Sequence, residues 1–196
     1  MRELIVHIEP RSIFRPLHSD TIFGAICFAI EQIHGDDVLT KIIKKFENTP
    51  PFLVSSVFPY VKSDNRRIHF LPKPIEDIEK INDYKKYIDS FKTLKSVKYI
   101  SEDIFNDWIN GRINGTILQN MDKYDVKEGL LFPKEKQYKF SIKNLDIPRN
   151  HINRLDNSPE IYYFDGYFYK NVGLFFMIRL YDEEYSLIIK NSPTFL

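Results

Sequence analysis

ELIVHIEPRSIFRPLHSDTIFGAICFAIEQIHG, residues 3–35, contains the patterns that decide the fold. Apolar side chains alternate with others over residues 3–9, a period of two that predicts a half-buried strand. Apolar residues then recur at helical spacing from Ile22 onward, in a helix for which Ser19 is the predicted N-cap and Gly35 the C′ residue that ends it. Because the apolar stripe of this helix is wide, we expect the helix to be buried between two layers.

The rest of the chain adds strands and one long helical stretch. In chain order we expect an amphipathic helix at about 37–46, a strand at 52–61 with a hairpin partner at 68–72, a helical insertion at about 75–128, a strand at 135–143, a hairpin at 160–170 that turns at Asp165-Gly166, and a strand at 173–181. This order predicts an α+β fold with an antiparallel sheet, for which the ferredoxin-like arrangement is the commonest solution.

Composition excludes several classes of protein. The 28 Lys and Arg residues nearly balance the 27 Asp and Glu residues of this 196-residue chain, so any binding site for a polyanion must be a local patch. The single cysteine, Cys27, excludes an intramolecular disulfide and a cysteine-only zinc site. No apolar run approaches the ~18 residues of a membrane span. The apolar stretch at the start of the chain is also too short for a signal peptide. We therefore expect a cytoplasmic protein without a membrane partner.

The sequence shows no pattern of a cofactor, metal or catalytic site. The five histidines lack metal-ligand spacing, and no phosphate-binding glycine loop or nucleophile motif occurs. His18 alone needs weighing, because it precedes a predicted helix N-terminus and follows a loop that contains Arg11 and Arg15. Three interpretations of His18 stay open: a structural histidine, a contact to an RNA phosphate, or an acid or base in metal-free RNA cleavage.

A local basic patch is predicted at residues 133–154, PKEKQYKFSIKNLDIPRNHINR. This segment contains six Lys or Arg residues against two acidic ones, in a chain whose formal net charge is +1. We expect Arg149, Asn150, His151 and Arg154 on a loop between a strand and the aromatic hairpin. Arginine can bind phosphate oxygens in a fork, and neighbouring aromatic rings can stack on unpaired bases. The segment therefore predicts RNA binding, although a solvated surface remains the alternative for its lysines.

Four segments occur together in an order that resembles one protein family. They are LHSDTIFGA at 17–25, SSVFPY at 55–60, FLPKP at 70–74 and PRNHINR at 148–154. Together they look like the RAMP subunit that caps the 5′ end of the guide RNA in type III-A CRISPR effector complexes. The resemblance runs from residue 1 to about residue 180.

The resemblance implies a non-catalytic, RNA-binding subunit with ferredoxin-like (RRM-like) domains. Such a subunit holds the 5′ handle of the crRNA and links the large polymerase-like subunit to the backbone RAMP subunits, with a β-hairpin thumb that here corresponds to about 145–172. The implied domains are 1–134, with the helical insertion, and 135–196, with the thumb and part of a second domain. Gly24 is expected to let the first helix approach the sheet closely. The resemblance and the basic segments together predict RNA contacts at Arg11, Arg15, His18, Ser19, Lys73, Arg149, Asn150, His151 and Arg154.

One departure from the family leaves alternatives open. Family members are usually longer and have a glycine-rich loop near the C-terminus, whereas this sequence ends in NSPTFL at 191–196 without that loop. This predicts a truncated or split version. The first alternative function is a metal-independent endoribonuclease that processes the crRNA precursor, with His18 and a Tyr or Lys as acid and base. The second is a protein-only scaffold that lacks a complete RNA site.

Overall fold

The computed structural model divides into two compact units. It describes the whole chain except residues 1, 65, 76–86, 114–116, 153–158 and 183–196. Unit 1 comprises residues 1–10, 14–57 and 174–196, and unit 2 comprises residues 11–13 and 58–173. Unit 1 is discontinuous because the last strand in the described residues pairs with the first. The division into domains 1–134 and 135–196 stays a prediction.

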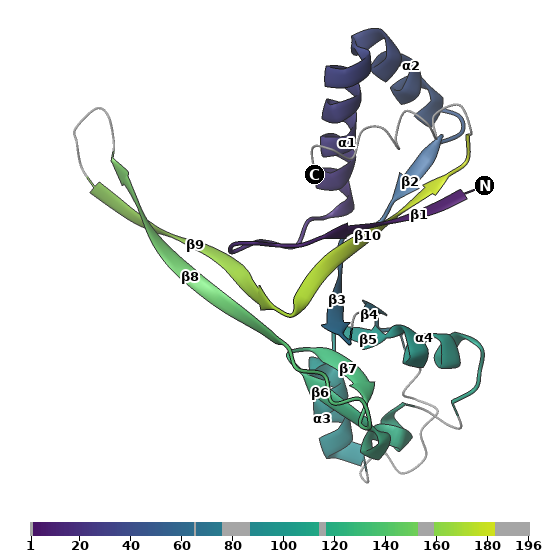
Figure 1. The fold of residues 1–196 in the computed structure, drawn as a ribbon, viewed down its shortest axis with the longest axis vertical. Coiled ribbons are helices and arrows are strands. Elements are labelled where there is room, and N and C mark those ends of the chain that lie inside the picture. The colour runs from purple at the N-terminus through teal and green to yellow at the C-terminus, as the bar shows by residue number, and fades with distance from the viewer. Residues whose placement is uncertain (1, 65, 76–86, 114–116, 153–158, 183–196) are drawn as a thin grey trace. The chain divides into compact units, whose positions relative to one another are not determined.

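Unit 1 is an antiparallel sheet with two helices. Its elements are β1 (Arg2–Ile8), α1 (Ser19–His34), α2 (Asp36–Phe46), β2 (Phe52–Val54) and most of β10 (Val172–Leu180) (Figure 1). β10 pairs with β1 from Arg2↔Leu180 to Ile8↔Leu174, and it pairs with β2 on its other side. The strands predicted at 3–9 and 173–181 and both N-terminal helices are therefore confirmed to within one residue at most ends.

The core of unit 1 lies on one face of α1. Most side chains of β10 and one stripe of α1 are buried. Phe23, Phe46 and Phe52 join α1, α2 and β2 with ring centroids 5.2–5.8 Å apart. Aromatic pairs at these separations are favourable beyond the area that they bury. Phe28, however, is 61% exposed. The expectation of a helix buried between two layers is therefore wrong, because the stripe of α1 is wider than the surface that covers it.

The ends of α1 confirm one sequence prediction and correct another. Gly35 closes the helix with φ +85°, and its N–H donates to the Glu31 carbonyl at 2.8 Å. At the other end the N-cap residue is His18 and not Ser19, and the His18 side chain makes no capping hydrogen bond.

The close approach expected at Gly24 occurs elsewhere. A Cβ at Gly24 would meet nothing within 4 Å, so that expectation is wrong. The tight position is Gly173 in unit 2, where a Cβ would lie 2.3 Å from Cζ of the fully buried Tyr60. The chain therefore needs a glycine at the start of β10 and not in the middle of α1.

Unit 2 contains a second set of strands and the helical insertion. β3 (Phe58–Ser63) and β4 (Arg66–Pro72) form the predicted hairpin, although the strand expected at 52–61 is interrupted between β2 and β3. β5 (Tyr99–Ser101) pairs with β4, β7 (Leu130–Pro133) runs parallel to β5, and β6 (Tyr124–Lys127) is antiparallel to β7. The helices described within the predicted insertion at 75–128 are α3 (Ile88–Ser96), α4 (Glu102–Ile109) and the 3-10 helix η3 (Leu118–Lys123). The insertion is not purely helical, because β5 and β6 also lie within it.

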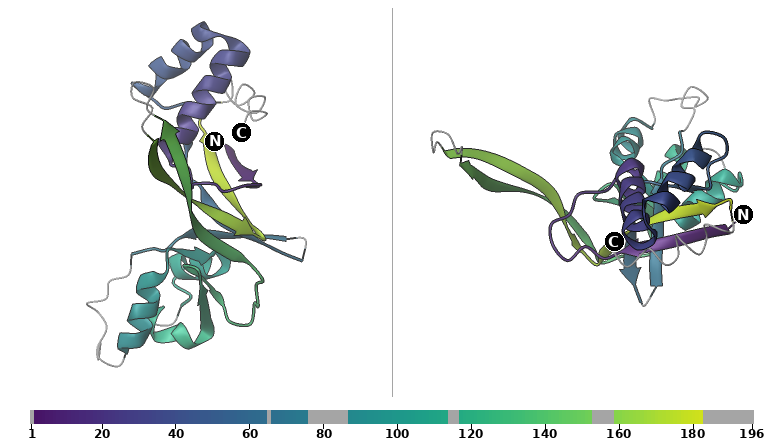
Figure 2. Two further views of the ribbon diagram at one scale, coloured as in Figure 1. Left: turned by 90° about the vertical axis from the view of Figure 1, so that its left-hand side faces the viewer. Right: turned by 90° about the horizontal axis from the view of Figure 1, so that it is seen from above.

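The last part of unit 2 is a long two-stranded ribbon. β8 (Ser141–Ile152) and β9 (Pro159–Lys170) pair over their whole length, from Ser141↔Lys170 to Ile152↔Pro159. They lie side by side in every view (Figures 1 and 2). The strand predicted at 135–143 therefore begins only at Ser141, and the predicted loop at 148–152 is strand.

The turn predicted at Asp165-Gly166 is wrong. Both residues lie inside β9, opposite Asp146 and Leu145 of β8. An Asp-Gly pair favours a tight turn, but a continuous ladder with β8 outweighs that local preference. The connection between the strands falls at 153–158, outside the described residues.

The fold class is therefore the predicted one, α+β with a mostly antiparallel sheet. The ferredoxin-like arrangement within it stays a prediction. No helix in the described part of the chain is long and apolar enough to cross a membrane.

Candidate nucleic-acid interface

The start of α1 is built from two of the motifs that were singled out in the sequence. The Ser19 N–H donates to Oγ of Ser56 at 3.1 Å, and the Val57 N–H donates to the Leu17 carbonyl at 3.0 Å. The segment 17–25 and the first part of the segment 55–60 are therefore in direct contact within unit 1.

These contacts leave fewer N–H groups for the phosphate contact that was predicted at the N-terminus of α1. A helix N-terminus binds anions through N–H groups that lack acceptors. Here the Ser19 N–H already has Ser56, and the Thr21 N–H donates to the Asp20 carboxylate at 2.8 Å. Two of the donors that a phosphate would use are therefore engaged, and a carboxylate already lies in the first turn.

His18 and Arg15 are exposed beside this helix start, whereas Arg11 belongs to unit 2. Within the described residues the His18 ring makes no hydrogen bond or ion pair, so no neighbouring group orients it as an acid or base. All three interpretations of His18 stay open, and the structure supplies no partner for the catalytic one.

The half-buried side chain of Lys73 makes a hydrogen bond within unit 2. Its Nζ donates to the Leu94 carbonyl at 2.8 Å, in the last turn of α3. A cation suits the partial negative charge at the C-terminus of a helix. The RNA contact expected at Lys73 would therefore have to compete with a structural hydrogen bond.

The strongest group of predicted residues lies on the ribbon. Directly opposed residues of antiparallel strands share a face, and successive residues alternate between faces. Arg149 is opposite Tyr162, and His151 is opposite Glu160. We call this side the polar face of the ribbon; its charged residues include Lys143, Arg149, His151 and Glu160, and Leu145, Ile147, Tyr162, Phe164 and Phe168 lie on the same side.

The ribbon separates residues that the sequence prediction had grouped together. Arg149 and His151 share the polar face, whereas Asn150 lies on the opposite face, and Arg154 falls outside the described residues. The sequence analysis did not include Tyr162 among the candidate residues. In the structure its side chain is 51% exposed. The period of two puts Tyr162 and Glu160 on one face once 159–170 is taken as one strand, but only the register with β8 places Tyr162 beside Arg149.

The base of the ribbon is anchored in the core of unit 2. Tyr169 packs against a cluster that includes Phe132, Phe140 and Val172, and the Ile142 N–H donates to the Glu128 carboxylate. Burial, with a smaller contribution from Tyr167 and Tyr99, raises the pKa of the Tyr169 hydroxyl above its usual value. The distal half of the ribbon, 148–152 and 159–163, is exposed on both faces.

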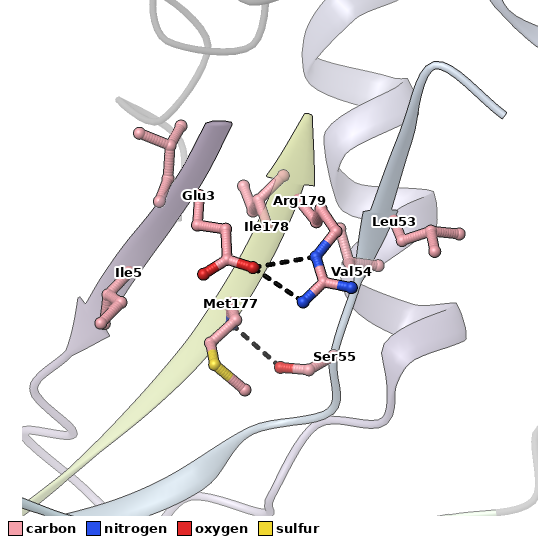
Figure 3. Close-up of a pocket in the computed structure, with 9 residues that line it drawn as sticks. Glu3, Ile5, Leu53, Val54, Ser55, Met177, Ile178 and Arg179 are labelled. Carbon is pink, nitrogen blue, oxygen red and sulfur yellow. Dashed lines mark hydrogen bonds and ion pairs between the residues drawn. The ribbon is translucent and has the colours of Figure 1, made fainter. Parts of the chain in front are cut away.

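A pocket in unit 1 offers no second site for chemistry. It has a volume of about 350 Å³ and lies against β1, β10 and β2 (Figure 3). Its charged residues pair with each other, since Nη2 of Arg179 lies 2.7 Å from Oε1 of Glu3, and Ser55 Oγ accepts from the Met177 N–H at 2.9 Å. In the described ranges no group of three or more His, Cys, Asp or Glu side chains could hold a metal ion.

Comparison with known proteins finds a relative in sequence. No family model matches the chain. Over 182 residues the chain is 25% identical to the CRISPR system Cms protein Csm4 of Thermococcus onnurineus (strain NA1), a match that covers 89% of this chain and 54% of the relative. The chain thus spans about half the length of the curated relative that it matches.

Solved structures agree with this match. A chain of the Csm3–Csm4 subcomplex of the type III-A CRISPR-Cas interference complex matches with a TM-score of 0.68 at 17% identity, over 98% of this chain and 62% of that chain. A chain of the Csm1–Csm4 cassette in complex with pppApA matches with a TM-score of 0.65 at 23% identity, over 99% and 66%.

The fold is accordingly similar to that of a chain in the Csm3–Csm4 subcomplex of the type III-A CRISPR-Cas interference complex and of a chain in a Csm1–Csm4 cassette. In sequence the chain is similar to Csm4, and together these likenesses confirm the resemblance that the four motifs predicted.

Proposed function

We propose that this chain is a non-catalytic, RNA-binding subunit of a type III-A CRISPR effector complex. It holds the 5′ handle of the crRNA and links the large polymerase-like subunit to the backbone RAMP subunits. The similarity to Csm4 supports this proposal, because similar chains occur in structures of a Csm3–Csm4 subcomplex and of Csm1–Csm4 cassettes.

The observation that carries the RNA-binding part is the pair of Arg149 and Tyr162 on the polar face of the ribbon. A guanidinium group can bind a phosphate in a fork, and an exposed tyrosine ring can stack on an unpaired base. Stacking contributes about 1–3 kcal/mol per base and does not depend on the base. Lys143 and His151 on the same face add cationic or hydrogen-bonding groups along the path of a single strand.

Binding without cleavage is the chemistry that the residues support best. Metal-independent cleavage of RNA needs an acid and a base on either side of the scissile bond, held in place by other groups. His18 is the single candidate that the sequence offered, and no described side chain forms a hydrogen bond with it. The proposal therefore includes no catalytic residue and no cofactor.

The test of this function is the binding of fluorescently labelled repeat-derived RNA, measured by anisotropy in EDTA at several salt concentrations. Arg149→Ala should weaken binding about tenfold and reduce the slope of log K against log salt by about one, as expected when one phosphate contact is lost. Arg112→Ala is the matched control, because Arg112 is an exposed arginine of the same unit outside the ribbon. An Arg149→Ala variant with unchanged affinity and slope would exclude the ribbon as the RNA site.

The same samples distinguish the alternatives. Cleavage of the RNA in EDTA that disappears in His18→Ala would identify an endoribonuclease and contradict the proposal. A chain that binds neither repeat RNA nor unrelated RNA, yet co-purifies with its protein partners, would be the protein-only scaffold.

A further inference from the structure

We propose that the polar face of the ribbon binds a single strand of RNA at two separate points, and that Phe168 and Lys143 form the second of them. The inference rests on the proposed function, in which Arg149 and Tyr162 form the first point. It adds Phe168 as a residue that stacks on a base, and it sets a minimum length for the RNA that occupies the whole face.

The ribbon contains one arrangement of side chains twice. Lys143 of β8 is directly opposite Phe168 of β9, and we call these two residues the proximal pair. Arg149 and Tyr162 are opposite each other in the same way and form the distal pair. Directly opposed residues have β-carbons about 4.5–5.5 Å apart, so in each pair a cation lies beside an aromatic ring. The phosphate and the base of a nucleotide can bind such a pair together.

Both pairs are open to a ligand. The side chains of Phe168 and Tyr162 are 45% and 51% exposed. Among the described residues, the side chains of Lys143 and Arg149 take part in no hydrogen bond or ion pair. A single exposed ring is ordinary on a protein surface. The same exposed pair, repeated on one face, indicates a ligand that has a repeat of its own.

The spacing of the two pairs fits a strand of nucleotides. The pairs lie six positions apart along both β8 and β9, which is about 20 Å at the rise of a β-strand. A stacked nucleic-acid strand advances about 3.4 Å per nucleotide, and an extended strand advances further. About six stacked nucleotides, or fewer extended ones, therefore reach from one pair to the other. A dinucleotide does not.

The charges of the ribbon favour RNA on this face over the other. Between the two pairs the polar face is uncharged, so an RNA strand there meets no carboxylate. On the opposite face Asp146 lies directly opposite Asp165, and both residues are exposed. Two neighbouring carboxylates repel a phosphate backbone. The face with the cations is therefore also the face without this repulsion.

The twist of the ribbon favours a single strand over a duplex. β8 and β9 cross each other along their length in Figure 1, as expected for a two-stranded ribbon, which twists strongly. The line from one pair to the other therefore winds around the ribbon. A single strand is flexible enough to follow this line, and its unpaired bases can stack on the two rings. The bases of a duplex are already paired and stacked.

The test compares RNAs of different length in three matched variants. Phe168→Leu and Tyr162→Leu each replace an exposed ring of the polar face, and Tyr163→Leu makes the same change on the opposite face. The three side chains are 45%, 51% and 67% exposed, so all three variants should keep the wild-type melting temperature. Competition against the labelled repeat RNA measures the affinity for a ten-nucleotide single strand of the repeat, for its duplex and for a dinucleotide.

We expect Phe168→Leu and Tyr162→Leu each to weaken binding of the ten-nucleotide strand about tenfold, as for the loss of one stacked base. Each should change dinucleotide binding by about twofold at most, because the other pair still binds a dinucleotide. Tyr163→Leu should bind every RNA as the wild type does. The duplex should bind more weakly than the single strand and should not respond to Phe168→Leu.

A second variant tests the cation of the proximal pair. Lys143→Gln should lower the slope of log K against log salt by about 0.7 for the ten-nucleotide strand, the value for one phosphate of a single strand. Lys136→Gln, at an exposed lysine outside the ribbon, is the control and should leave the slope unchanged.

The outcomes separate this inference from the proposed function. If Tyr162→Leu weakens binding of the ten-nucleotide strand and neither Phe168→Leu nor Lys143→Gln changes it, the proposed function stands and the inference fails. Equal losses in Phe168→Leu and Tyr163→Leu would also overturn the inference, because stacking would not depend on the face. So would a Phe168→Leu variant that loses affinity for a Csm1 or Csm3 counterpart and keeps its RNA affinity. A wild type that binds no RNA would overturn the proposed function, and the inference with it.

Discussion

The sheet of unit 1 and the β8–β9 ribbon use the same antiparallel pairing for opposite purposes. β10 pairs with strands on both sides, and most of its side chains are buried. β8 pairs with β9 alone, and no residue of β8 is fully buried. Because burial of apolar surface is the main stabilising term in folding, the sheet provides stability and the ribbon provides surface.

The comparison teaches where substitutions should affect stability and where they should affect binding. Substitutions in the sheet should lower the free energy of unfolding, and substitutions in the distal ribbon should leave it unchanged.

The largest expected effect is that of Phe176→Ala, a substitution at a fully buried position of β10. Removing a buried phenylalanine side chain should cost about 3–5 kcal/mol, from lost burial and from the cavity left behind. Tyr163→Ala, which removes a similar ring from the ribbon, should change stability by less than about 0.5 kcal/mol. Urea unfolding measures both values. Similar losses in the two variants would show that the ribbon is part of the cooperative core.

The next effect is expected at Gly173, where the chain passes from the ribbon to the sheet. Gly173→Ala places a Cβ against the buried ring of Tyr60, which packs with His69 and Arg67 and has little room to move. We expect a loss of about 1–3 kcal/mol. The control is Gly24→Ala, which meets open space on a helix and should instead stabilise the protein by about 0.5–1 kcal/mol. Thermal unfolding should therefore move in opposite directions for the two glycines.

A smaller effect is expected from the contact between the two motifs in unit 1. Ser56→Ala removes the oxygen that accepts the Ser19 N–H at the start of α1. The loss should be about 1 kcal/mol, comparable with the loss of a helix cap. Ser12→Ala, at an exposed serine, serves as the control in the same denaturation experiment. If the two serine variants unfold alike, the Ser56 hydroxyl does not stabilise the helix start.

The smallest effect concerns the base of the ribbon at high pH. Burial raises the pKa of Tyr169 in the folded protein, whereas in the unfolded chain the tyrosine hydroxyl titrates near pH 10. As the pH rises past about 10, the unfolded chain loses this proton first, so the free energy of unfolding should fall. Tyr169→Phe should lessen that fall, while the stability of both proteins stays flat between pH 7 and 9. A fall of equal steepness in both would assign it to other groups.

The sequence was sufficient where a single period described an element well. The alternation of β1, the apolar run of β10 and the helical spacing of α1 and α2 each led to the correct element, because burial on one face or one stripe imposes that period. The hairpin of β3 and β4 was also predicted, from its polar turn.

The sequence failed where long-range pairing overrode a local signal. Asp165-Gly166 favours a turn by itself, and only the ladder with β8 makes it strand. Ser19 has the side chain of a typical N-cap. In the structure, however, Oγ of Ser56, which is 37 residues away, accepts a hydrogen bond from the Ser19 N–H at the start of the helix. The candidate RNA residues were likewise grouped by their position in the chain, and a loop assignment could not show that Asn150 lies on the opposite face from Arg149.

The unbroken register of β8 and β9 restricts how this arm can change in evolution. A single-residue insertion in one strand would turn every side chain beyond it in that strand to the other side, so an insertion in β8 before Arg149 would move Arg149 to the face of Ile161. Changes of length by two residues preserve the sidedness of the ribbon. Related sequences should therefore differ in the length of this hairpin in even steps, or else contain a bulge that restores the phase.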